Sequence, residues 1–238
     1  MTRNEGPLFN RLPSVRYIEE KKKELSLLGS DLWGTTDECV RNQLVRKSAV
    51  HCNLTPTDNI VDLALQLEED VAIIHQGMLA AICFCFPSSW IPSERIGLRL
   101  SEIHQPVADS DVLVKMSDRL ASTMADQHLG SFKRSVWTIT SSDSLSNHPS
   151  RKSLTVPNSI KDLFMRVETQ TTEPLGDGVT SLFFVKINVF PLTDIWEDHK
   201  KEILDSINSM SNNILTYKNL HHIKILLNKH DEGLISHK

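Results

Sequence analysis

The stretch that decides the fold covers residues 71–86 and reads VAIIHQGMLAAICFCF. Two apolar segments, 71–75 and 79–86, flank a turn around Gly77, which predicts a β-hairpin. The apolar run 78–87 is too short to cross a bilayer, so we expect a buried strand there and no membrane segment. The hairpin therefore predicts a sheet whose core begins at this point of the chain.

Outward from the hairpin, the chain alternates between helical and strand patterns. Apolar residues at helical spacing predict helices over 17–28, 36–50, 59–69, 111–127 and 194–210. Alternating residues predict three more strands over 132–140, 164–171 and 179–190. The predicted order is therefore two strands, a helical insert and three strands, which is the order of a PAS-like fold. We therefore expect an α+β protein with a five-stranded antiparallel sheet and flanking N- and C-terminal helices.

These elements divide the chain into three segments that we expect to form one compact domain. They are an N-terminal helical cover over 1–69, a PAS-like core over 70–192 and a C-terminal helical segment over 193–238.

Composition excludes several classes of function. A net charge of -4 and 24% charged residues show no basic excess, so we expect no nucleic-acid partner. Residues 1–13 lack the apolar core of a signal peptide, which predicts a cytoplasmic protein. No two of the four cysteines form a C-x-x-C pair, and we expect buried free thiols in a reducing compartment at Cys39, Cys52, Cys83 and Cys85.

A histidine follows the hairpin in a loop rich in proline and serine. Pro106 restricts the backbone beside His104 and cannot donate a hydrogen bond, which helps to fix the imidazole. A neutral imidazole is a good iron ligand, and a carbonyl or carboxylate can hold its second nitrogen. Taken alone, such a histidine is more often structural. Other candidate ligands are His75, His128, His221 and His222.

Two later strands carry charged residues that could bind a ligand. Arg134 lies near Trp137, and its guanidinium could bind carboxylates, although a solvent-facing arginine is an equal alternative. Arg166, Glu168 and Gln170 occupy alternate positions, so they should project from one face. That face could be solvated. If it lines a cavity, Glu168 could hold an ammonium group or accept a proton.

In combination, these motifs resemble the heme-dependent oxidative N-demethylase (dimethylamine monooxygenase-like) family. The similarity extends over about 68–192, with weaker echoes at 31–33 and 217–218. The matching motifs are the Phe-Pro-Ser corner with Trp90, Ile103-His104 before Pro106-Val107, Arg134 with Trp137, and the Arg-Val-Glu strand at 166–168. Val136 stands where the family has asparagine, and Ala108 stands where a second proline is usual.

The resemblance implies a b-type heme in the PAS-like core, with His104 as the axial metal ligand. Arg134, Trp137 and Arg166 would bind the cofactor, and Glu168 would be the catalytic carboxylate. The apolar walls would come from Phe84, Phe86, Trp90, Met116, Leu120 and Met124.

The implied activity is a monooxygenase that removes a methyl group from a small methylated amine, with dioxygen as co-substrate. The chain has no G-x-G-x-x-G after a strand and no ferredoxin-type cysteine set. Electrons would therefore come from a partner flavin or iron–sulfur reductase, in a hetero-oligomer. The departures at Val136 and Ala108 favour an alternative, a heme-binding sensor or heme-storing protein without turnover. A PAS-like interaction domain with no cofactor is a third possibility.

Overall fold

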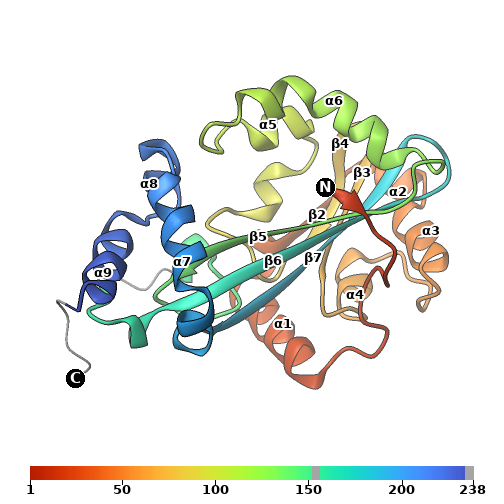
Figure 1. Cartoon of the computed structure of the whole chain (residues 1–238). Coiled ribbons are helices and arrows are strands. Elements are labelled where there is room, and N and C mark those ends of the chain that lie inside the picture. Colours follow the sequence, from red (N-terminus) through yellow and green to blue (C-terminus); the bar gives the residue numbers. More distant parts are fainter. Residues whose placement is uncertain (152–155, 234–238) are drawn as a thin grey trace.

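A single antiparallel sheet forms the centre of the computed structural model, which describes residues 1–151 and 156–233 (Figure 1). The strands are β1 (Thr2–Arg3), β2 (Trp33–Thr35), β3 (Asp70–His75), β4 (Met78–Cys83), β5 (Phe132–Thr140), β6 (Phe164–Pro174) and β7 (Thr180–Pro191). They are ordered β1-β5-β6-β7-β3-β4-β2, and every neighbouring pair is antiparallel.

The predicted α+β class is confirmed, but the predicted count of five strands is wrong because the sheet has seven. The five predicted strands are neighbours in the order β5-β6-β7-β3-β4, and β1 and β2 are added at the two edges. Both added strands lie within the segment 1–69, for which we expected helices alone. At two and three residues, they are too short to show the alternation that identifies a strand.

The hairpin of β3 and β4 forms as the sequence predicts. Gln76 and Gly77 both have positive φ, at 52° and 78°, which is the backbone of a tight two-residue hairpin turn. Every residue of β3 is buried, which explains the run of apolar residues 71–74 between Asp70 and His75. The strand therefore lies at the centre of the fold, next to β7.

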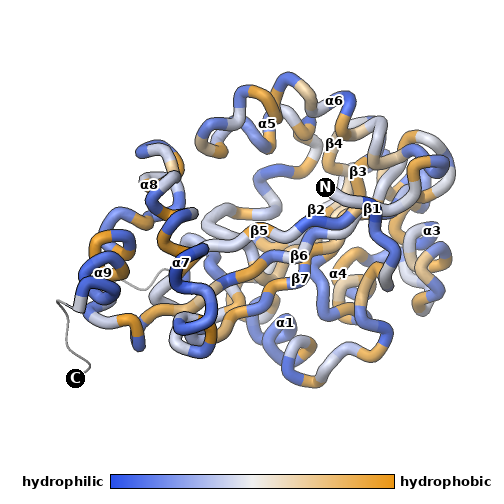
Figure 2. Tube along the Cα trace, viewed as in Figure 1, coloured by the Kyte–Doolittle hydropathy of each residue, from blue (hydrophilic) through white to orange (hydrophobic). Residues whose placement is uncertain are grey.

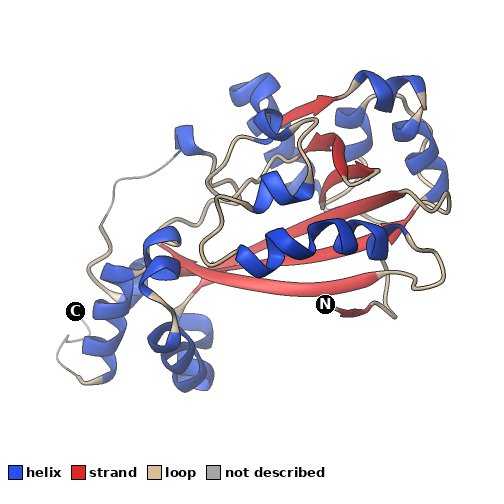
Figure 3. Ribbon diagram, turned by 90° about the horizontal axis from the view of Figure 1, so that it is seen from above, coloured by secondary structure: helices blue, strands red, loops and turns tan. Residues whose placement is uncertain are grey.

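Helices cover both faces of the sheet. Those before the hairpin are α1 (Val15–Leu28), α2 (Asp37–Arg41), α3 (Leu44–His51) and α4 (Ile60–Ala64). Those after it are α5 (Leu100–His104), α6 (Asp111–Ala125), α7 (Thr193–Ser209), α8 (Asn212–Tyr217) and α9 (His221–Asp231). Seen from above, α6 lies along the strands (Figure 3). Figure 1 shows α6 and α1 on opposite sides of the sheet. None of these described helices is both long and apolar enough to cross a membrane.

Three apolar clusters hold the helices on the sheet. Figure 2 shows apolar residues along the strands and on the helices, where they alternate with hydrophilic ones. The largest cluster joins the hairpin to α3 and α4 through residues such as Leu63 and Ile82. A second, with Ile139 and Trp196, joins the far ends of β5–β7 to α7 and α9. The third contains Ala121 and packs α6 on the sheet. All four cysteines are buried and free, and burial raises the pKa of Cys39 to about 11.

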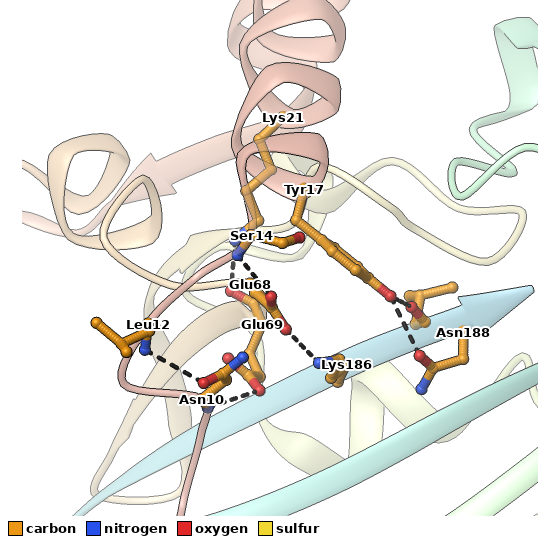
Figure 4. Close-up of polar contacts among 10 residues, drawn as sticks. Asn10, Leu12, Ser14, Tyr17, Lys21, Glu68, Glu69, Lys186 and Asn188 are labelled. Carbon is orange, nitrogen blue, oxygen red and sulfur yellow. Dashed lines mark hydrogen bonds and ion pairs between the residues drawn. The ribbon is translucent and has the colours of Figure 1, made fainter.

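A buried charge network fixes α1 to the sheet (Figure 4). Lys21 is fully buried, and its Nζ donates to the carbonyl oxygen of Ala64 at 2.9 Å and to that of Glu69. Glu68 accepts a hydrogen bond from the backbone N–H of Ser14 at 2.7 Å and pairs with Lys186. Because these buried charges are compensated, they hold the N-terminal segment in one position.

Candidate functional site

The chain leaves β4 through a corner that a buried carboxylate holds in place. Asp70 accepts hydrogen bonds from the backbone N–H groups of Cys85 and Phe86, both at 2.9 Å. Burial raises the pKa of Asp70, and the positive charge of Lys21 opposes that shift. The strand therefore turns at a fixed point and places Ser88 beside the sheet.

Arg166, on β6, holds two loops through hydrogen bonds: the corner after β4 and the loop after β5. Its side chain is fully buried, and its Nη2 donates to the carbonyl oxygen of Phe86 at 2.9 Å, while Nη1 donates to that of Leu145. Nε and Nη2 also lie 3.4 and 3.3 Å from Ser88 Oγ. Burial lowers the pKa of Arg166, and the charge of Glu168 opposes that shift. The predicted cofactor ligand Arg166 is thus directed at backbone carbonyls and a serine.

Both carboxylate oxygens of Glu168 accept hydrogen bonds. Oε1 accepts from Ser88 Oγ, and Oε2 accepts from Gln170 Nε2 at 3.2 Å. The Oε1 atom of Gln170 in turn accepts from Nε of Arg134 at 2.6 Å. We call these five residues, Arg166, Ser88, Glu168, Gln170 and Arg134, the Glu168 network. As the period of a strand predicts, Arg166, Glu168 and Gln170 project from one face.

His104 ends helix α5, and the hairpin positions this helix. The N–H of Leu79 donates to the carbonyl oxygen of Leu98 at 2.9 Å, and the N–H of Leu100 donates to the carbonyl oxygen of Gly77 at 3.1 Å. Within α5, Nδ1 of His104 lies 2.6 Å from the carbonyl oxygen of Leu100. A carbonyl can only accept, so Nδ1 carries the proton and Nε2 presents its lone pair.

The surroundings of His104 favour the neutral ring. Burial lowers the pKa of His104, and the positive charge of Arg134 lowers it further, against the opposing effect of the hydrogen bond to Leu100. Arg134 is the member of the Glu168 network whose charge acts on the imidazole. Among the described residues, Nε2 of His104 has no hydrogen-bond partner.

Trp137 lies on the other face of the sheet from Arg134. The two residues are three positions apart on β5, and side chains alternate along a strand. Trp137 is paired with Val167 across the sheet and packs against the apolar cluster of α7 and α9. The structure therefore brings Arg134, Arg166, Glu168 and His104 into one region and places Trp137 behind it.

Helix α8 brings two residues to the site whose roles the sequence did not reveal. Nζ of Lys218, just after the helix, donates to the carbonyl oxygen of Trp137 at 3.0 Å. Burial lowers the pKa of Lys218, and the charge of Glu168 opposes this. Burial and the charge of Glu168 both raise the pKa of Tyr217. The only sequence signal was the weak echo at 217–218, which gave no function.

Three of the other candidate histidines make hydrogen bonds within the fold, and the fourth, His128, lies at the surface. Nδ1 of His75 lies 2.7 Å from Thr180 Oγ1. Nε2 of His221 lies 2.9 Å from Thr216 Oγ1, and Nε2 of His222 lies 2.9 Å from the carbonyl oxygen of Pro157. Across 1–151 and 156–233, no three His, Cys, Asp or Glu side chains converge as a metal site.

Two surface hollows lie away from the Glu168 network. One, of about 460 Å³, is lined by α8 and α9 residues such as Leu215 and Ile225. The other, of about 380 Å³, lies beside Trp33 and Asn59. Neither hollow is lined by His104 or by a residue of the Glu168 network. We take the network and His104 as the candidate site because of their hydrogen bonds and charges.

The fold and the site together define an α+β protein with a half-buried, uncharged imidazole and a carboxylate held by two hydrogen bonds. A family model described as "Haem-dependent oxidative N-demethylase, alpha subunit-like" matches residues 30–227, and the chain belongs to this family. No curated protein matches the chain. The match confirms the family that the motifs indicated. The name of the family is that of a heme-dependent oxidative enzyme. Its term "alpha subunit" implies an assembly of several subunits.

Proposed function

We propose that this chain is the heme-binding subunit of a monooxygenase that oxidatively N-demethylates a small methylated amine. The observation that carries the proposal is the state of His104. Its Nδ1 is held by Leu100, its pKa is lowered by burial, and its Nε2 is free of described partners. An imidazole in this state is ready to bind a metal without first losing a proton.

The residues around His104 fit a b-type heme. In this proposal Nε2 of His104 is the axial ligand. Arg134 uses only Nε for its bond to Gln170, so its terminal nitrogens, which make no other hydrogen bond within the described residues, can bind a heme propionate. Trp137 supports β5 from the opposite face, and Arg166 holds the corner that carries Ser88. The core would be PAS-like, with α5 and α6 covering the cofactor side.

When bound, heme supplies the activation of dioxygen that an oxidative N-demethylation requires. The part of the protein is to place the amine. Glu168 is partly exposed and anionic when it accepts from Ser88 and Gln170, so it can hold a protonated amine and take up its proton. Removal of that proton frees the nitrogen lone pair.

Electrons would come from a separate flavin or iron–sulfur reductase. Dioxygen chemistry at a heme consumes two electrons for each methyl group oxidised, and the sequence has no motif for a nicotinamide or an iron–sulfur cluster. The alpha-subunit description of the family supports a partner of this kind.

A heme-binding sensor or heme-storing protein is the second candidate. Its support is that Val136, which lies opposite Glu168 in the strand register, has no polar group to make the hydrogen bond that the family's asparagine could make there. In that case the chain would bind heme and release no product.

The test is formaldehyde release from dimethylamine by the heme-loaded chain with a surrogate reductase. We expect formaldehyde from the wild type and a loss of at least about tenfold in Glu168→Gln, because the carboxylate that holds the amine becomes neutral. Glu173→Gln, on the same strand and on the opposite face, is the matched control and should keep its activity. Heme binding with no formaldehyde from the wild type would contradict the proposal and favour the sensor.

A further inference from the structure

We propose that Ser88 is a positioning residue that fixes the Glu168 carboxylate for the amine and separates it from the buried charge of Arg166. The inference rests on the proposed function, because it assigns to Glu168 the task of holding the substrate. It is carried by contacts between residues 78 and 80 positions apart in the chain.

The direction of the hydrogen bonds at Ser88 follows from the chemistry of its neighbours. Guanidinium nitrogens can only donate, so Nε and Nη2 of Arg166 donate to Ser88 Oγ, at 3.4 and 3.3 Å. A serine hydroxyl has one proton. That proton points to Oε1 of Glu168, which is the acceptor within reach. Ser88 Oγ therefore accepts from Arg166 and donates to Glu168.

The position of Ser88 is itself fixed. The N–H of Asn147 donates to the carbonyl oxygen of Pro87 at 2.9 Å, and the N–H of Ser89 donates to the carbonyl oxygen of Asn147 at 3.0 Å. These bonds pair the corner with the loop after β5. Arg166 binds a carbonyl oxygen on each of these two segments. The same guanidinium thus holds the backbone around Ser88 and its hydroxyl.

A serine between arginine and glutamate has a consequence for binding. A direct fork between guanidinium and carboxylate would occupy both oxygens of Glu168. Here each oxygen accepts one neutral donor, Ser88 Oγ or Gln170 Nε2, and a carboxylate has about four acceptor positions in all. Glu168 is therefore held in one orientation while acceptor positions remain for an ammonium group.

The test measures amine binding to the heme-loaded chain by calorimetry with dimethylammonium chloride. We expect Ser88→Ala to weaken binding about tenfold, which corresponds to the loss of one hydrogen bond to a charged group. Ser88→Thr keeps the hydroxyl and should stay within about threefold of the wild type. The matched control is Ser89→Ala, the exposed next residue, which should bind the amine normally. Heme affinity, measured by absorption, should be the same in all four proteins.

A double-mutant cycle separates this role from a merely structural one. If Ser88 acts through Glu168, Ser88→Ala should have no further effect on amine binding in a Glu168→Gln background. Wild-type amine affinity in Ser88→Ala, with binding lost in Glu168→Gln, would overturn the role of Ser88 alone. Wild-type affinity in Glu168→Gln would overturn the proposed function as well. If Ser88→Ala does not fold, Ser88→Cys, a weak donor of similar size, takes its place and carries the same expectation.

Discussion

Val136 and Glu168 are direct cross-strand neighbours on β5 and β6, and they project from the same face of the sheet. Val136 is 36% exposed. An apolar surface thus lies beside the carboxylate that we propose as the amine site. It can contact the methyl groups of a substrate whose nitrogen is held by Glu168.

This arrangement predicts that Val136 influences which amine is preferred. In Val136→Asn, a polar amide replaces the apolar surface, and we expect the Kd of trimethylamine to rise about tenfold while that of methylamine changes less. Calorimetry on the heme-loaded protein measures both. Ser135→Asn, the neighbouring position on the opposite face of β5, is the control. Equal effects on the two amines would contradict this role.

The contact of Lys218 with β5 predicts an effect on stability. Lys218→Ala removes the hydrogen bond to the carbonyl oxygen of Trp137, which fastens α8 beside the site. We expect a loss of about 1 kcal/mol, or a Tm about 2–4 °C lower, by differential scanning fluorimetry. Lys224→Ala is the control, because Lys224 makes a longer, exposed bond of 3.4 Å to the carbonyl oxygen of Asn208. An unchanged Tm in Lys218→Ala would show that α8 is held by other contacts.

Arg166 should be among the most sensitive positions in the chain. Arg166→Met leaves Glu168 without its buried counter-charge and the carbonyl oxygens of Phe86 and Leu145 without their donor. We expect the free energy of unfolding, from urea titration, to fall by about 3 kcal/mol. Arg46→Met removes an exposed pair with Asp58 and should have little effect. Similar losses in the two variants would contradict a structural role for Arg166.

His104 predicts a pH dependence of the heme-free protein. Burial lowers its pKa below the ordinary value of 6.5, so between the lowered pKa and 6.5 the unfolded chain binds more protons than the folded one. Stability should therefore decrease as the pH falls below about 6.5, and this contribution should be missing in His104→Gln. Urea titrations of both proteins at about pH 7.5 and pH 5.5 measure it. If the difference in unfolding free energy between the two proteins were the same at both pH values, the lowered pKa of His104 would be contradicted.

Much of the sheet could be predicted because its strands are long or continuously apolar. The strand 132–140 was predicted at the residues where β5 lies, and the helix 111–127 differs from α6 only at its end. The predicted helix over 59–69 is shorter in the structure, where α4 is capped by the side chain of Asn59 and ends at Ala64. Local periodicity detects long elements, and it does not detect where tertiary contacts end a short one.

The site could be predicted only in part. Strand alternation placed Glu168 with Gln170, and the same rule separates Arg134 from Trp137, which the motif alone had grouped together. The part played by Ser88 could not be foreseen, because its partners Arg166 and Glu168 come from a strand that lies far along the chain. Hydrogen bonds of that kind depend on the folded sheet and leave no local pattern.

The most direct test of the heme assignment is titration of the chain with hemin, followed by its Soret absorption, in wild type, His104→Gly and His128→Gly. We expect a ligated-heme spectrum from the wild type and from His128→Gly, whose exposed imidazole lies outside the site. His104→Gly should lose that spectrum and regain it when imidazole is added. A wild-type spectrum in His104→Gly without imidazole would contradict the account.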